Sequence, residues 1–530
     1  MKENNAFFVT TPIFYPSNYL TLGNCYPVIA ADAIARFHKM LGKDVFFLTG
    51  SDEHGAKVAK VAEERGMGVK EFIDDVIDDA KNLFKMLDVE YDRFIRTTDE
   101  DHTLTAQKVF TKLYEKGYIY KSKYEGHYCL PCESFWTESQ LVDGKCPDCG
   151  RDVVWQEEEA YFFKLSEFGD RLLKLYKDNP NFLQPISRVN EMVNNFIKPG
   201  LHDLCVSRTS VKWGIPVEFD PNHTIYVWID ALSNYISALG YLSEDDTLFQ
   251  KYWPANVHIV GKEIVRFHAI IWPSILMALD LPLPERVFGH GWLLLGGQKL
   301  SKSKESKALE VYEPRILAPR YSADALRYSL LREVPFGSDG AYSTENFLKR
   351  INSDLCNDFG NLVNRTFAMT KKYFEKVVPS QNELLDVDNA FIQKVENARD
   401  NAIKLMENFE VSKAVAEIFS IFSLGNKYIE ETMPWVLAKS DEKRLETVMF
   451  NLLESIKIGT ILAQSFIPQG ASKVLKAYGF ESGKGFLKDI ETFGGLQSGI
   501  VLGDVPVLYP RLDVEKELDE LVTLVELNKK

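Results

Sequence analysis

Five short apolar segments constrain the fold of this chain more than any other feature of its sequence. Each ends in small, polar or aromatic residues and is followed by a helical pattern; they cover residues 7–16, 45–55, 225–235, 257–268 and 286–295. This alternation is typical of an α/β fold with a parallel sheet, in which ligands bind beyond the carboxyl ends of the strands. We therefore expect the residues that end these segments to face one pocket.

The chain is longer than one hydrophobic core usually supports, so about two to four structural units are expected for its 530 residues. A long insertion separates the second apolar segment from the third. After about residue 346, apolar residues recur at helical spacing with very little Gly or Pro, which predicts a helical bundle. The expected parts are an α/β domain (1–115 and 223–290), an insertion (116–222), a loop-bearing region (291–345), a helical domain (346–475) and a C-terminal extension (476–530).

Charge and hydropathy exclude two broad classes of protein. The net charge of −14 argues against a chain that coats nucleic acid nonspecifically, although it leaves room for a local basic track. No segment approaches the ~20 apolar residues of a membrane helix, and the start of the chain lacks the regions of a signal peptide. We therefore expect a cytoplasmic protein with no membrane partner.

Four of the seven cysteines form two C-x-x-C pairs, Cys129/Cys132 and Cys146/Cys149. Four thiolates at this spacing can surround zinc tetrahedrally and leave no open position for catalysis. The pattern therefore predicts one structural zinc ion per chain, with a redox pair as the alternative.

A basic motif, KLSKSK, occupies residues 299–304 after the fifth apolar segment. Its lysines and serines suit the negative charge of a triphosphate and of the phosphate group that leaves it. A solvated basic loop is the alternative for the motif taken alone.

KLSKS resembles the KMSKS signature of class I aminoacyl-tRNA synthetases. The segments TTPIFYPS, TGSDEHG, YVWIDALSNY, FHAIIWP and REVPFGSDG resemble the methionyl-tRNA synthetase family, and the resemblance covers essentially the whole chain. It implies a Rossmann-like catalytic domain with a parallel sheet and a zinc-bearing insertion, followed by an all-α helical-bundle domain that binds the anticodon.

The chain departs from the family at the HIGH signature, where residues 21–24 are Thr-Leu-Gly-Asn. Each transition-state donor is worth roughly 10²- to 10³-fold in rate, so uncompensated loss of both histidines would silence the enzyme. Because an Asn amide and a Thr hydroxyl can both donate hydrogen bonds, we expect Thr21 and Asn24 to replace them. The same pattern resembles the signature of tryptophanyl enzymes. Two smaller departures are Glu263 in place of a family Asp and a longer connection after KLSKS.

The resemblance also implies the site residues. The catalytic residues are Thr21, Gly23, Asn24, Lys299 and Lys302. ATP binding is implied for these five and for Lys262, Glu263, His290, Gly291, Ser301 and Ser303. Methionine binding is implied for Ile13, Tyr15, Asp52, Trp228, Ala231, Leu232, Tyr235, His268 and Trp272, with Asp52 on the amino group. Anticodon recognition is implied for Asn361, Arg365 and Trp435.

The function that the resemblance implies is methionine–tRNA ligation. Methionine is activated by ATP and Mg²⁺ to methionyl-adenylate and then transferred to tRNA(Met), including the initiator. Because the sequence ends without the oligonucleotide-binding appendix of some relatives, a monomer is expected. Two alternatives remain: a paralogue with impaired activation that acts as a tRNA-binding, regulatory, biosynthetic or resistance protein, and a synthetase for another amino acid.

Overall fold

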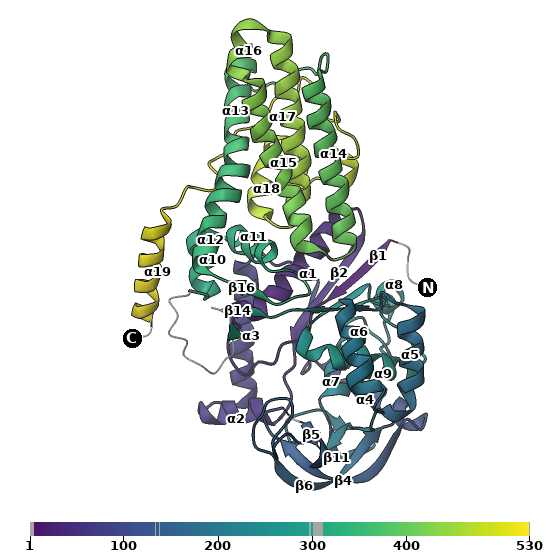
Figure 1. The fold of residues 1–530 in the computed structure, drawn as a ribbon. Coiled ribbons are helices and arrows are strands. Elements are labelled where there is room, and N and C mark those ends of the chain that lie inside the picture. The colour runs from purple at the N-terminus through teal and green to yellow at the C-terminus, as the bar shows by residue number, and fades with distance from the viewer. Residues whose placement is uncertain (1–4, 133, 137, 296–297, 300–310, 529–530) are drawn as a thin grey trace. The chain divides into compact units, whose positions relative to one another are not determined.

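The computed structural model describes residues 5–132, 134–136, 138–295, 298–299 and 311–528. The chain divides into two compact units, each made of discontinuous segments, and Figure 1 gives the labels of their elements. Unit 1 comprises Met1–Leu20, Phe46–Asn82 and Tyr91–Gly289. Unit 2 comprises Thr21–Val45, Leu83–Glu90 and His290–Lys530.

Unit 1 is built on a six-stranded sheet with the strand order β3-β2-β1-β12-β13-β7. The strands are β1 (Ala6–Thr10), β2 (Asp44–Ser51), β3 (Arg93–Arg96), β7 (Leu183–Gln184), β12 (Val257–Gly261) and β13 (Val287–His290). The pairs β1–β12, β2–β3 and β7–β13 are parallel. Every residue of β1 and β12 is buried, as expected for strands covered on both faces. The predicted Rossmann-like parallel sheet is confirmed.

The prediction that residues 225–235 form a strand of this sheet is wrong. The segment is mostly helix α7 (Trp228–Ser237), and the strand before it, β11 (Asp220–Ile225), belongs to a small antiparallel sheet with β9 (Ser207–Arg208) and β10 (Pro216–Val217). The side chains of Ile229, Leu232 and Ile236 are all buried. Their i, i+3, i+7 spacing places them on one face of a helix, whereas a strand would have divided them between two faces.

The further α-helices in the described part of unit 1 are α2 (Ala56–Glu64), α3 (Val69–Met86), α4 (Glu100–Glu115), α5 (Gly169–Asp178), α6 (Ile186–Met192), α8 (Thr247–Tyr252) and α9 (Trp272–Ala278). The last residues of α3 belong to unit 2. One apolar cluster joins strand residues such as Phe8 and Leu48 to helix residues such as Phe110 and Trp272. This core fixes the strand ends from which the candidate site residues project.

The insertion carries a second, antiparallel sheet with the order β5-β4-β6-β8. Its strands are β4 (Ile119–Cys129), β5 (Ser134–Trp136), β6 (Val154–Phe163) and β8 (Leu204–Cys205). Strands β4 and β6 pair in continuous register from Ile119↔Phe163 to Tyr128↔Val154. The long β4–β6 ladder therefore ends beside Cys129.

Unit 2 contains helix α1 (Leu22–Met40), a small sheet and a helical bundle. The sheet has the order β15-β14-β16, from β14 (Leu293–Leu295), β15 (Gln298–Lys299) and β16 (Gly340–Tyr342). Besides α1, the α-helices of unit 2 are α10 (Pro314–Tyr321), α11 (Ala323–Glu333), α12 (Thr344–Arg350), α13 (Asn361–Phe374), α14 (Asp386–Glu407), α15 (Val411–Thr432), α16 (Pro434–Ser440), α17 (Glu442–Ala463), α18 (Pro468–Ala477) and α19 (Val514–Asn528).

Figure 1 shows α13, α14, α15 and α17 side by side, in agreement with their mutual contacts. The prediction of a helical bundle after residue 346 is confirmed. In the described part of the chain, no helix has the length and apolar character that a bilayer span requires. The finer domain boundaries given by the sequence stay a prediction.

Candidate active site

The loop after β2 places Asp52 beside the first strand segment. The backbone N–H of Asp52 donates to Phe14 O at 2.9 Å, and Phe14 N–H donates to Gly50 O at 3.0 Å. A Cβ at Gly50 would lie 2.0 Å from Ile95 O, so only glycine permits this approach of β2 to β3. Asp52 is therefore held against the segment that carries Ile13 and Tyr15.

Tyr235 and His268, which lie far from this loop in the sequence, form a direct hydrogen bond with each other. His268 Nδ1–H donates to Ile264 O at 2.9 Å, so its Nε2 is the acceptor for the Tyr235 hydroxyl at 2.7 Å. Burial lowers the pKa of His268 to about 4. At neutral pH the pair therefore presents an uncharged, polarisable surface.

A second buried histidine, His258, contacts both Trp272 and Tyr235. Trp272 Nε1–H donates to His258 Nε2 at 3.3 Å, and His258 Nδ1 faces Thr10 Oγ1 at 2.7 Å. Burial lowers the pKa of His258 well below its ordinary value, and the ring packs against Tyr235 with centroids 4.2 Å apart. Every polar atom of the His258 ring thus has a partner, which allows an aromatic wall with no buried charge.

Trp228 stacks face to face on Phe267, with ring centroids 3.5 Å apart and an interplanar angle of 13°. Ala231 and Leu232 lie on the same helix, α7, and both are buried. A wall of stacked and edge-on aromatic rings suits an apolar, polarisable ligand such as a thioether.

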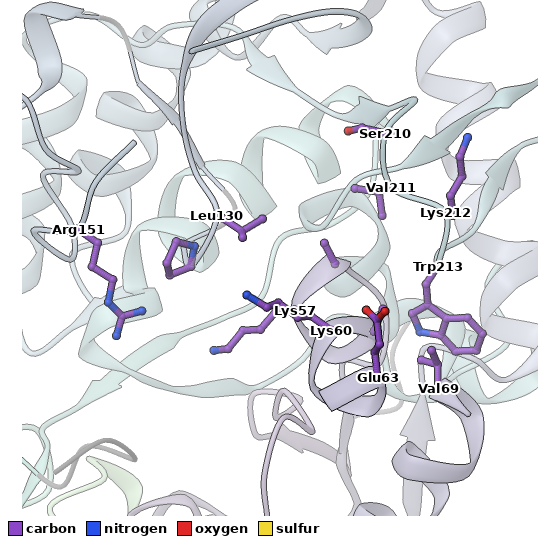
Figure 2. Close-up of a pocket in the computed structure, with 13 residues that line it drawn as sticks. Lys57, Lys60, Glu63, Val69, Leu130, Arg151, Ser210, Val211, Lys212 and Trp213 are labelled. Atoms are coloured by element: carbon purple, nitrogen blue, oxygen red, sulfur yellow. The ribbon is translucent and has the colours of Figure 1, made fainter. Parts of the chain in front are cut away.

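A pocket of about 800 Å³ in unit 1 opens next to α2 (Figure 2). Figure 2 shows Lys57 and Lys60 projecting from α2 toward Leu130, with Arg151 beyond it, and Lys212 and Trp213 on another wall. The four basic side chains are all exposed. The pocket therefore combines cationic groups with apolar surface, although the whole chain carries a net charge of −14.

In unit 2, Thr21 and Asn24 bond to each other at the start of α1. The Thr21 N–H and its hydroxyl both donate to Asn24 Oδ1, at 3.1 and 2.9 Å. Because only the amide oxygen can accept from the N–H, this geometry fixes the orientation of the Asn24 amide. The Asn24 NH₂ group faces away from Thr21 and remains a donor at the N-terminus of the helix, where anions bind favourably.

The other predicted nucleotide residues lie in several segments. His290 is buried, its Nδ1 donates to Gly291 O at 2.8 Å, and a Cβ at Gly291 would lie 2.0 Å from the Ser338 backbone. Lys262 and Glu263 begin the turn after β12 in unit 1. The backbone of Lys299 pairs with Leu294. Ser301, Lys302 and Ser303 lie outside the described residues.

The predicted anticodon residues lie in unit 2. Asn361 and Arg365 are both on α13, where Asn361 Nδ2 donates to Asn426 and Arg365 Nη2 donates to Glu430, at 3.3 and 2.8 Å. Trp435, in the first turn of α16, is 39% exposed. A large aromatic side chain that stays accessible to this degree is available for stacking on a base.

The four predicted metal ligands form one cluster, with all four sulfur atoms within 4.8 Å of one another. The Sγ–Sγ distances are 3.5 Å for Cys129–Cys149 and 3.8 Å for Cys132–Cys146. Tetrahedral zinc with Zn–S bonds of ~2.3 Å requires a separation of ~3.8 Å between its sulfurs. The cluster therefore fits a structural zinc ion.

Cys146→Ser is expected to reduce the zinc content of the purified protein from about one ion per chain to a small fraction, because three ligands hold zinc less tightly than four. Elemental analysis by mass spectrometry measures the content. Cys205→Ser, outside the cluster, should keep full occupancy. Full occupancy in Cys146→Ser would contradict the assignment of this cluster.

Known proteins resemble the chain over nearly all of its length. Residues 7–154 and 149–367 match the family model described as tRNA synthetases class I (M), and residues 378–520 match the anticodon binding domain of methionyl tRNA ligase. The chain belongs to the methionyl-tRNA synthetase family. Together the two models cover nearly all of the sheet of unit 1 and most of the helices of unit 2.

Individual members of this family are close in sequence and in structure. The methionine–tRNA ligase of Caldanaerobacter subterraneus subsp. tengcongensis is 54% identical over 518 residues, which are 97% of this chain and 80% of that protein. The enzyme of Clostridium tetani is 52% identical over 99% of this chain and 81% of its own length. The Mycobacterium tuberculosis methionyl-tRNA synthetase in complex with methionyl-adenylate has a TM-score of 0.90 and 38% identity, covering 96% of this chain and 100% of that one.

The sequence did not point to several residues that the structure brings into the site. Phe267 pairs with Trp228, His258 supports Tyr235 and Trp272, and His54 contacts Asp230. Phe267 and His54 stand in segments that carry the family resemblance, which was the available signal. Their partners lie far away in the sequence, so spacing alone could not identify these contacts.

Proposed function

We propose that the chain catalyses the ATP-dependent ligation of methionine to tRNA. The observation that carries this function is the family-wide match, in which both the class I model and the methionyl anticodon-binding model align with the chain. In the first step the carboxylate of methionine attacks the α-phosphate of ATP and pyrophosphate leaves. In the second step the terminal ribose hydroxyl of tRNA takes the methionyl group and AMP leaves. Neither step needs a protein nucleophile, so positioning and electrostatics supply the catalysis.

For methionine, Asp52 takes the ammonium group and the aromatic wall takes the thioether. The neutral Tyr235–His268 pair and the stacked Trp228 support this proposal because they offer polarisable surface without charge. The remaining residues of the proposed pocket are Ile13, Tyr15, Ala231, Leu232 and Trp272.

For ATP, the amide of Asn24 at the N-terminus of α1 supports a contact with phosphate oxygens. Thr21 orients this amide in the described structure, so we infer that Thr21 acts mainly through Asn24. Mg²⁺ bound together with ATP would supply charge neutralisation of the triphosphate in this proposal. The further proposed ATP ligands are Gly23, Lys262, Glu263, His290, Gly291, Lys299, Ser301, Lys302 and Ser303.

For tRNA, the accessible ring of Trp435 and the polar side chains of Asn361 and Arg365 suit unpaired anticodon bases. The cationic pocket of Figure 2 adds a surface that favours a polyanionic partner. The proposed partners are therefore L-methionine and tRNA(Met), including the initiator, and the proposed state is a monomer.

Purified protein is expected to exchange labelled pyrophosphate into ATP when methionine is present, and not with any other of the common amino acids. It is also expected to charge tRNA(Met) transcripts, and to charge them far less when the CAU anticodon is changed. Exchange with a different amino acid would overturn the assignment of methionine. Binding of tRNA without any exchange would instead favour a paralogue that has lost activation.

A further inference from the structure

A buried carboxylate, Asp230, connects three separate elements of unit 1. His54 Nδ1 lies 2.7 Å from Asp230 Oδ2, and His102 Nε2 lies 2.9 Å from Asp230 Oδ1. Asp230 is 1% exposed and His102 is fully buried. Because an ionised carboxylate only accepts hydrogen bonds, both imidazoles donate to it. We call Asp230, His54 and His102 the Asp230 clamp.

The clamp links the segments that carry Asp52 and Trp228, two residues of the proposed methionine site. Asp230 is in the first turn of α7, two residues after Trp228, and His54 follows Asp52 by two residues in the loop between β2 and α2. His102 belongs to α4, where its second ring nitrogen lies 2.8 Å from Ser237 Oγ at the other end of α7. The hydrogen bond from His54 to Asp230 therefore joins the loop of Asp52 to the helix of Trp228.

The loop of His54 is also held from its other side. Trp213 Nε1–H donates to Glu53 O at 2.7 Å, and the Trp213 ring contacts His54 edge-on with centroids 6.0 Å apart. The Glu53 side chain is fully buried and receives two hydrogen bonds from Arg96, at 2.6 and 3.0 Å. These contacts hold the backbone next to Asp52 in place, and the bond from His54 to Asp230 ties that backbone to α7.

The first turn of α7 needs such a restraint. Val227, immediately before Trp228, has φ +24° and ψ −69°, a conformation that is strained for a β-branched residue. Strained backbone persists only where surrounding contacts fix it. Tyr226 N–H donates to Val206 O, Trp228 stacks on Phe267, and the bond between His54 and Asp230 adds a further restraint three residues after Val227.

We propose that His54 is a positioning residue for methionine, which holds Asp230 so that Asp52 and Trp228 keep a fixed separation. This inference rests on the proposed methionine site. His54 does not touch methionine in this proposal; it sets the distance between the group for the ammonium and the ring for the thioether side chain.

Protonation of His54 strengthens the clamp. Burial acts to lower the pKa of His54, but the charge of Asp230, its hydrogen bond and the charge of Glu53 together raise it. The Asp230 carboxyl has a pKa of about 2: burial opposes this shift, and the two histidines outweigh burial. Among the described residues, the titratable groups that face His54 are Asp230, Glu53 and, across the carboxylate, His102. The ion pair is therefore complete below the pKa of His54 and is lost as pH rises through it.

His54→Ala is expected to raise the KM for methionine about 10- to 100-fold in pyrophosphate exchange, since a hydrogen bond between charged groups is worth that factor. The kcat and the KM for ATP should change less than about 3-fold. His54→Asn places an amide N–H near the position of Nδ1 and should recover most of the loss. In the parent protein the KM for methionine should rise as pH increases through the pKa of His54, and this rise should be absent in His54→Asn.

Equilibrium dialysis with labelled methionine gives the same comparison without catalysis, and exposed His202→Ala is the matched control. An unchanged methionine affinity in folded His54→Ala overturns the positioning role. A fall in kcat together with a rise in both KM values, for methionine and for ATP, overturns it as well. If His54→Ala does not fold, persistence of the pH dependence in His54→Asn overturns it. Absence of methionine-dependent exchange in the parent protein refutes the proposed function instead, so the two failures are distinguishable.

Discussion

Asn24→Ala is expected to lower the kcat for methionine-dependent pyrophosphate exchange about 100- to 1,000-fold, the range observed when one preorganised transition-state donor is removed. The structure gives the reason. The Asn24 oxygen accepts two hydrogen bonds from Thr21, which leaves the NH₂ group oriented at the N-terminus of α1. Steady-state exchange at saturating ATP and methionine measures the effect.

Two further variants separate the donor from the fold. Asn24→Asp keeps the acceptor for Thr21 but replaces the donor with a negative charge, so it should lose at least as much activity as Asn24→Ala. Asn24→His restores the family signature and should retain activity. Asn401→Ala, exposed on α14, is the matched control. A kcat within about 3-fold of the parent in Asn24→Ala would remove Asn24 from the proposed catalytic set.

Arg327→Met is expected to lower the free energy of unfolding by about 3–5 kcal/mol, because it breaks a buried ion pair and leaves Asp32 with Arg36 as its arginine partner. Both side chains are fully buried, with Arg327 Nη2 2.5 Å from Asp32 Oδ2. Arg327 also donates to the backbone oxygens of Leu87, Asp88, Phe466 and Ser465. This one guanidinium joins α11 to α1, to the segment after α3 and to the segment after α17, all within unit 2.

Urea denaturation followed by circular dichroism measures the loss. Adding Asp32→Asn to Arg327→Met should recover part of it, since a neutral amide oxygen can still accept from Glu90 N–H, now 2.8 Å from Asp32 Oδ1. Exposed Arg511→Met should change stability by less than about 1 kcal/mol. A loss of similar size in the two arginine variants would mean that burial of the ion pair does not govern stability here.

The sequence predicted the zinc cluster well because its ligands come in local pairs. Two C-x-x-C motifs restrict the geometry of four sulfurs, whatever the intervening chain does. The parallel sheet was also predictable from a local signal, because buried strands occur in the sequence as short apolar runs. The segment 225–235 was misread because an apolar run of that length is compatible with a buried helix as well as with a strand.

The aromatic wall was predictable only in part. The resemblance indicated Trp228, Tyr235, His268 and Trp272, which stand in recognisable segments. It gave no hydrogen-bond partners, and therefore not the neutral state of His268, which depends on Ile264 O and on burial.

The sequence by itself determined the fold class, the metal ligands and the family, because these depend on local spacing and on long stretches of matching residues. Only the tertiary structure decided that Thr21 acts on Asn24, that Asp230 binds two histidines, and that Arg327 joins four segments. The physical reason is that hydrogen bonding and burial depend on distances of a few ångströms between residues far apart in the chain, such as the 295 positions between Asp32 and Arg327.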